Sequence, residues 1–146
     1  MDIKDVLRAD DVLIGLGAAN KRRLLEKLAA KAGTDLSFDP EAILAALLRR
    51  EALGSTGTGD GVALPHARLE NLARVHGVFA RLRQPVDFQS IDGAPVDLVC
   101  LLLLPVAGAT QLDALASVAR RLREKDRLAR LRRARDATAL REALVG

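Results

Sequence analysis

Residues 98–106 form the longest apolar stretch of this chain, nine residues in a row with the sequence LVCLLLLPV. Polar and apolar side chains do not alternate along it, so a strand formed here needs cover on both faces. Its length, which includes Pro105, is far below the roughly 20 apolar residues that cross a bilayer. We therefore predict a central β-strand over residues 96–104 and no membrane span.

The elements around this strand predict a mixed α/β fold. Short apolar runs predict strands at residues 12–16, 62–64 and 75–82, and helical spacing predicts helices over about 20–31, 40–50, 110–122, 126–133 and 136–144. Asn20 and Asp39, the latter followed by Pro40, are typical helix caps. Because helices precede and follow the strands without regular alternation, we expect a mixed α/β (α+β) layer structure. No linker or repeat interrupts the sequence, which indicates a single domain over residues 1–146.

Composition narrows the classes of function. The 146 residues are 49% hydrophobic and 29% charged, with a net charge of +4, which suits one domain with a real core. The three aromatic residues are all Phe, so no platform exists for stacking bases. The single cysteine, Cys100, excludes an intramolecular disulfide and a Cys-rich zinc site, and the amino terminus lacks the pattern of a signal peptide. We expect a cytoplasmic protein.

A glycine-rich segment lies between Leu53 and Gly61, where four glycines alternate with serine, threonine and aspartate. This composition predicts a loop rich in free backbone N–H groups, a typical cradle for an anion. The candidate phosphate-binding residues are Ser55, Thr56, Gly57, Gly59 and Gly61. No Lys-Ser or Lys-Thr pair follows the last glycine, so the segment is not a nucleotide P-loop and ATP is not implied.

His66 follows this loop directly after Pro65. A neutral imidazole is a good nucleophile for phosphorus, because its lone pair is free near neutral pH without a separate base. Backbone N–H groups, and an arginine from the Arg49 and Arg50 pair that ends the preceding helix, would stabilise the oxygens of a phosphoryl group in transfer. This combination favours phosphoryl acceptance over an isolated surface histidine.

Three stretches of the sequence carry a family resemblance: RREALGSTGTGDGVALPHARL, QPVDFQSIDGAPVDLVCLLLLP and LDALASVARRLRE. They closely resemble the enzyme IIA domain of the bacterial phosphoenolpyruvate-dependent phosphotransferase system, first its nitrogen-regulatory type and then its fructose and mannitol type. The resemblance implies a mixed sheet of about five strands flanked by helices, His66 as phosphoryl acceptor and Arg50 as its supporting arginine. It also implies an HPr-like phosphocarrier downstream of enzyme I as donor, and regulatory targets such as kinases or potassium transporters. The residues themselves indicate no cofactor.

One residue departs from the family pattern. The family usually has a second histidine in an HLxxLA motif that assists the acceptor, and here the motif reads QLDALA, with Gln111 in that place. A glutamine amide donates hydrogen bonds but carries no positive charge. Three interpretations stay open: a phosphocarrier with slower transfer or altered donor preference, a regulatory binding protein that works without phosphorylation, and a sugar-specific IIA component. His76 does not match the second histidine and is interpreted as structural or surface.

Other signals favour weaker alternatives. The sequence GLGAAN at residues 15–20 resembles a dinucleotide fingerprint but lacks its third glycine, so a strand-to-helix turn is favoured. Residues 120–135 contain nine basic and two acidic side chains, and we interpret this run as a solvated helix face, not as a nucleic-acid site. The two histidines lack HExxH spacing, which argues against a catalytic metal.

Overall fold

The structure, a computed structural model, describes residues 2–107 and 110–146, with the side chains of residues 110 and 111 left out. The described residues form six α-helices, a short 3₁₀ helix (η1) and a sheet of six strands. In chain order these are α1 (Ile3–Val6), η1 (Ala9–Asp11), β1 (Val12–Leu16), α2 (Lys21–Leu36), α3 (Pro40–Ala52), β2 (Gly57–Gly59), β3 (Val62–Ala63), β4 (His66–Leu69), β5 (His76–Val86), β6 (Val96–Pro105), α4 (Thr110–Arg121), α5 (Lys125–Arg133) and α6 (Ala137–Val145).

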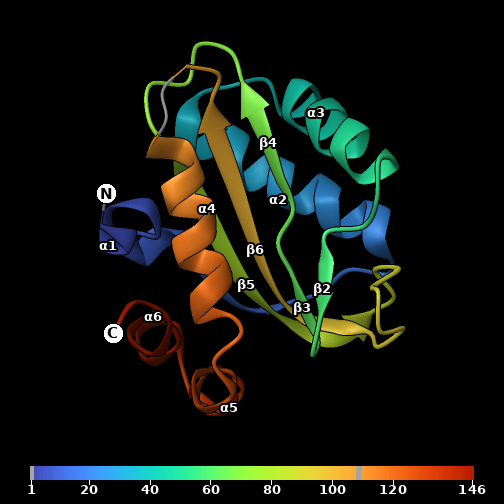
Figure 1. The fold of residues 1–146 in the computed structure, drawn as a ribbon, viewed down its shortest axis with the longest axis vertical. Helices are drawn as coiled ribbons and strands as arrows, with labels where there is room; N and C mark the ends of the chain where they lie inside the picture. The colour runs from blue at the N-terminus through green and yellow to red at the C-terminus, as the bar shows by residue number, and fades with distance from the viewer. Residues whose placement is uncertain (1, 108–109) are drawn as a thin grey trace.

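The apolar strand β6 lies at the centre of the sheet, as its sequence predicts (Figure 1). On one side β6 pairs with β5 in antiparallel fashion, and β5 pairs in parallel with the edge strand β1. On the other side two short strands, β3 and then β4, lie parallel to successive parts of β6, and β2 pairs with β3. The mixed α/β fold is confirmed, with six strands where about five were expected.

Both faces of β6 are buried, and its side chains alternate between two cores. Leu98, Cys100, Leu102 and Leu104 pack with residues of α1, α4, α5 and α6. Val99, Leu101 and Leu103 pack on the opposite face with residues of α2 and α3. The sheet is therefore a layer between two sets of helices (Figure 1). No helix within the described ranges combines the length and the apolar composition that a membrane span requires.

The predicted caps of α2 and α3 are confirmed. The Asn20 side chain accepts a hydrogen bond from the Arg23 N–H at 2.9 Å, and the Asp39 side chain accepts one from the Glu41 N–H at 3.0 Å. Helix α2 continues to Leu36, five residues beyond its predicted end at Lys31. The reason is tertiary packing, because Ala32 and Gly33 are buried against the sheet and against residues 38–40, which overrides the weak helix propensity of this last turn.

The sequence predicted that the whole glycine-rich segment is a loop, and this prediction is wrong for part of it. Residues Gly57–Gly59 form the edge strand β2, which turns back into β3 through Asp60 and Gly61. These two residues have φ of +56° and +79°. Positive φ at both central residues is typical of a tight two-residue hairpin turn. The strand was missed because glycine has a low intrinsic preference for strands, and here pairing with β3 supplies the order.

A substitution at Gly61 tests how tightly this hairpin is held. An alanine Cβ would lie 2.5 Å from Arg132 Nη2 and 2.8 Å from Asp97 Oδ1. These two side chains form a bidentate ion pair, and they must shift to make room for the added Cβ. We expect Gly61→Ala to lower the free energy of unfolding by about 2 kcal/mol, measured by urea denaturation. Gly93→Ala is the control.

Gly93 has a similar φ of +74°, but nothing lies within 4 Å of a Cβ added there. Gly93→Ala therefore carries only the cost of the left-handed backbone, and we expect a smaller loss of about 1 kcal/mol. Equal losses at the two glycines would show that Arg132 and Asp97 do not constrain the hairpin.

Candidate functional site

His66 lies where the chain passes from β3 to β4 along the side of β6. Pro65 has no N–H, and its carbonyl accepts a hydrogen bond from the Leu102 N–H at 3.0 Å. His66 is the first residue of β4 and lies in register with Leu102 of β6. Because paired residues share a sheet face, the His66 side chain leaves the sheet on the face of Leu102, which is the face covered by α4.

The orientation of the imidazole is fixed by one hydrogen bond. His66 Nδ1 lies 2.9 Å from the carbonyl oxygen of Leu64. A carbonyl oxygen only accepts, so in this contact Nδ1 carries the hydrogen and donates it. The neutral ring therefore has its lone pair on Nε2. The side chain is half-buried, which leaves part of the ring accessible to a reacting group.

Arg50 lies in the last turn of α3, a helix that packs against β4. Its Nη1 donates a hydrogen bond to the Gly54 carbonyl at 2.9 Å, which holds the guanidinium over the turn that leads into the glycine-rich segment. No hydrogen bond joins Arg50 to His66 within the described part of the chain. Helix α3 contacts β4 from the sheet face opposite to the one that His66 occupies, because α3 packs in the core of Ala67 and Leu69. The role of Arg50 beside His66 stays a prediction.

Polar groups of the glycine-rich segment are bonded within the protein. Glu51, whose side chain is only 6% exposed, accepts hydrogen bonds from the Thr56 N–H at 3.1 Å and from the Thr56 hydroxyl. The Ser55 hydroxyl donates to the Phe88 carbonyl at 2.7 Å and accepts from the Gly57 N–H at 3.0 Å. These groups hold the segment in place, and its contact with a phosphoryl group stays a prediction.

Gly59 and Gly61 belong to the β2–β3 hairpin, and the Gly61 carbonyl accepts hydrogen bonds from the N–H groups of Asp97 and Leu98.

Glu51 is a residue that the sequence analysis did not single out. Glu51 holds the glycine-rich segment through its contact with Thr56, five residues later. In the sequence, its place next to Arg50 was the only local sign that Glu51 belongs to the site.

Three of the nine basic residues at positions 120–135 bond to other parts of the protein. Arg121 and Arg127 donate to the Leu144 and Gly146 carbonyls at the end of α6. Arg132 pairs with Asp97 at 2.9 Å and donates to the Asp60 carbonyl at 2.6 Å. Because three of the guanidinium groups stabilise the fold, the run provides weaker support for nucleic-acid binding than its composition suggests.

Comparison with known proteins places this arrangement in a family. Residues 5–145 match the family described as phosphoenolpyruvate-dependent sugar phosphotransferase system, EIIA 2. The chain belongs to this family. It is 46% identical over 146 residues to a nitrogen regulatory protein of Bradyrhizobium diazoefficiens. The alignment covers 99% of this chain and 95% of the relative.

Two solved structures have the same fold as this chain. The crystal structure of nitrogen regulatory protein IIA-Ntr from Neisseria meningitidis superimposes with a TM-score of 0.92 at 31% identity, covering 97% of this chain and 98% of that one. The crystal structure of the mannitol IIA of Escherichia coli superimposes with a TM-score of 0.80 at 21% identity, covering 94% and 98%, and shows the likeness of fold alone. The predicted resemblance to the EIIA family is thus confirmed.

Gln111 is the second residue of α4 in this EIIA 2 chain. Its side chain lies outside the described residues. Helix α4 covers the same sheet face as His66, so the backbone at position 111 belongs to the layer that His66 faces. The assisting role of Gln111 stays a prediction.

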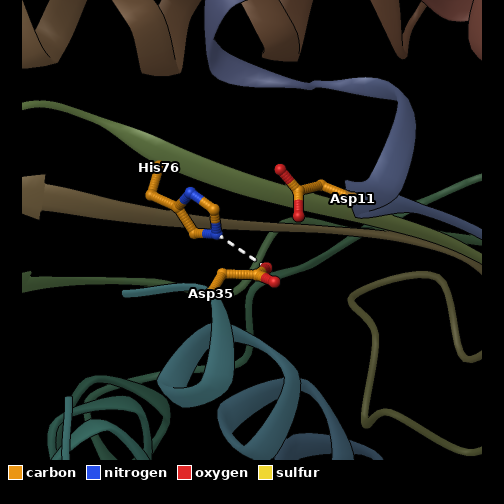
Figure 2. Close-up of side chains that lie close together, drawn as sticks. All are labelled: Asp11, Asp35 and His76. Atoms are coloured by element: carbon orange, nitrogen blue, oxygen red, sulfur yellow. Dashed lines mark hydrogen bonds and ion pairs between the residues drawn. The ribbon is translucent and has the colours of Figure 1, made fainter. Parts of the chain in front are cut away.

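His76 lies on the other face of the sheet from His66. It is in register with Leu103 of β6, whose side chain packs in the core under α2 and α3. Its Nε2 lies 3.2 Å from Asp35 Oδ2 near the end of α2 (Figure 2). The two histidines therefore leave the sheet in opposite directions, and His76 does not contribute to a site around His66.

The carboxylates near His76 have shifted pKa values. Burial raises the pKa of the Asp11 carboxyl, and its contact with the Asp35 carboxyl adds to this. Burial also acts to raise the pKa of Asp35, but hydrogen bonds with Asp11 and Lys31 outweigh it and hold the pKa below its usual range. Two carboxyl groups thus share a confined space with Lys31 and His76.

Proposed function

We propose that this chain is a cytoplasmic phosphohistidine carrier of the nitrogen-regulatory phosphotransferase branch, with His66 Nε2 as the phosphoryl acceptor. The observation that carries the proposal is the hydrogen bond from Nδ1 to the Leu64 carbonyl, 2.9 Å long, which leaves Nε2 as the nucleophilic nitrogen. The family membership and the likeness to nitrogen regulatory proteins support the assignment.

The transfer step moves one phosphoryl group between two imidazoles. The Nε2 lone pair attacks phosphorus in the phosphohistidine of an HPr-like carrier, and the P–Nε2 bond forms as the donor's P–N bond breaks. The donor nitrogen keeps the electron pair of the broken bond. Positive charge that develops on the His66 ring strengthens the hydrogen bond from Nδ1 to Leu64, because a charged donor makes a stronger bond. Leu64 thus acts as a fixed acceptor that favours the phosphorylated ring.

The expected donor is an HPr-like protein downstream of enzyme I. Phosphorylation adds about two negative charges at the α4 face of the sheet, which is enough to repel or recruit a docking protein without a large change of fold. Targets such as kinases or potassium transporters would then bind according to the state of His66.

Incubation with phosphoenolpyruvate, enzyme I and an HPr-like carrier tests the proposal. We expect one acid-labile phosphoryl group by intact mass, and phosphorus–nitrogen coupling in the NMR spectrum should place it on Nε2. A stable label on Nδ1 would contradict the proposal, since it requires loss of the Leu64 hydrogen bond.

Arg50→Ala is expected to slow phosphoryl transfer by roughly ten- to a thousandfold, because a cation that stabilises the transferring oxygens is lost. Rapid-quench measurement of labelling gives the rate. Arg49→Ala, one residue earlier and exposed, is the matched control and should leave the rate close to that of the unaltered chain. Equal effects of the two changes would indicate a general electrostatic contribution and no specific role for Arg50.

The second candidate function is a regulatory binding protein that works without phosphorylation, and Gln111 is the observation that favours it. Gln111→His supplies the cationic group that the family usually has, and we expect faster transfer, by roughly tenfold, in the same assay. An unchanged rate would mean that the missing cation does not limit transfer. Partner binding that is insensitive to His66→Asn would favour the second function.

A further inference from the structure

Three potential metal ligands converge on the side of the sheet away from His66. Asp11 comes from η1, Asp35 from α2 and His76 from β5, and one ligand atom of each lies within 4.8 Å of the others. Figure 2 shows the three side chains pointing toward one another. His76 Nε2 and Asp35 Oδ2 are 3.2 Å apart, close to the separation of about 3.3 Å between two ligands of a tetrahedral zinc ion.

Asp11 is the most buried of the three potential ligands, and its carboxylate requires a nearby positive charge. Its side chain is 5% exposed, and its polar contacts are with the Asp35 carboxyl and the Lys31 ammonium. Its one ion pair in the described part of the chain is with Lys31, at 3.4 Å, while the same ammonium lies closer to Asp35, at 2.7 Å. A buried carboxylate requires compensating charge, and the Lys31 ammonium and the His76 imidazole are the groups that face this pair. When both carboxyls are ionised and His76 is neutral, the cluster has an excess negative charge.

We propose that Asp11, Asp35 and His76 form a binding site for a divalent transition-metal ion of the zinc class. Two carboxylate oxygens and an imidazole nitrogen suit such an ion, and three protein ligands leave coordination positions for water. The ion would replace the Lys31 ammonium between the carboxylates. Nε2 of His76 must then present its lone pair, so the ring hydrogen lies on Nδ1.

The site has an entry path. A cavity of about 460 Å³ is lined by Asp11, Asp35 and His76, and its wall also includes Asp5, Asp10, Arg8 and Arg74. Two acidic and two basic side chains on the wall leave no strong net charge to exclude a cation. The ligands are 24 and 41 residues apart in sequence, so their spacing gives no metal motif, which is why the sequence analysis did not find them.

Titration of the metal-free full chain with Zn²⁺ by calorimetry tests the proposal, and Co²⁺ absorption reports the geometry of the site. We expect one equivalent to bind and to raise the melting temperature, because an ion that binds only the folded state stabilises it. His76→Gln and Asp35→Asn should each weaken binding at least tenfold. His66→Asn should leave binding unchanged, which separates this site from the proposed phosphoryl acceptor.

Lys31→Met is the decisive variant, because it removes the ammonium that competes with the ion. It should tighten Zn²⁺ binding by about tenfold or more, whereas Lys27→Met, one helical turn earlier, should not. Lys27 donates to the Gly17 carbonyl and is a matched control for loss of a lysine on α2. Absence of saturable binding in both the unaltered chain and Lys31→Met would overturn the proposal. Binding lost in His66→Asn and kept in His76→Gln would overturn it as well.

Discussion

Replacing His66 by Asn is expected to abolish phosphoryl labelling completely. The asparagine amide nitrogen can still donate a hydrogen bond to the Leu64 carbonyl, as Nδ1 of His66 does at 2.9 Å, so the local backbone should be kept. Its lone pair is delocalised into the amide, so no nucleophilic nitrogen remains for phosphorus. Intact mass after incubation with phosphoenolpyruvate, enzyme I and an HPr-like carrier measures the result.

His76→Asn is the matched control for this experiment. It also exchanges a histidine for asparagine, but its side chain lies on the opposite sheet face beside Asp35. We expect full labelling of His76→Asn, and thermal unfolding should show that both variants are folded. Labelling that survives His66→Asn would refute the assignment of the acceptor. Labelling that is lost in both variants would indicate an indirect effect of His76.

Local signals in the sequence predict much of the fold. The apolar run at residues 98–104 identifies β6 as the central strand because it has no polar face, and Asn20 and Asp39 mark the starts of α2 and α3 because their side chains satisfy the first N–H groups. These features depend on interactions within a few residues. Pattern and capping chemistry therefore suffice to predict them.

Features that depend on distant contacts could not be predicted. Strand β4 has four residues and is ordered by pairing with β6, more than 30 residues later. The Nδ1 hydrogen bond of His66 depends on the break between β3 and β4, which leaves the Leu64 carbonyl free to accept it. The position of His66 in the motif was visible in the sequence, whereas its tautomer and the sheet face that it occupies required the fold.

Glu51 illustrates the same limit and leads to the second large prediction. It joins three parts of the chain: its own helix α3, Thr56 in the glycine-rich segment, and Lys21 at the start of α2, whose Nζ lies 2.9 Å away. Lys21 also lies over the ring of Phe88, at 4.4 Å from the centroid. The Glu51 side chain is 6% exposed and that of Lys21 is 16% exposed, so water screens this ion pair poorly.

We expect Glu51→Ala to lower the free energy of unfolding by about 3–5 kcal/mol. The change leaves the Lys21 ammonium without its anion and both Thr56 donors without an acceptor, and the loss of a little-exposed ion pair together with two hydrogen bonds costs an amount of this order. Urea denaturation measures it. Glu51→Gln keeps an acceptor for Thr56 and should lose less. Glu26→Ala breaks exposed pairs with Arg22 and Arg23 and should leave stability nearly unchanged.

A double-mutant cycle decides whether the loss comes from the uncompensated charge. If the unpaired ammonium carries most of the cost, adding Lys21→Met to Glu51→Ala should recover part of the stability, because the remaining buried charge is then gone. If the lost Thr56 hydrogen bonds account for most of the loss of stability, the double variant should be no more stable than Glu51→Ala alone. A loss below about 1 kcal/mol in Glu51→Ala would show that the network does not anchor the glycine-rich segment. The hydrogen-bond result would make Glu51 the residue that fixes the turn beside Arg50, and hence the position of the Arg50 guanidinium on the Gly54 carbonyl.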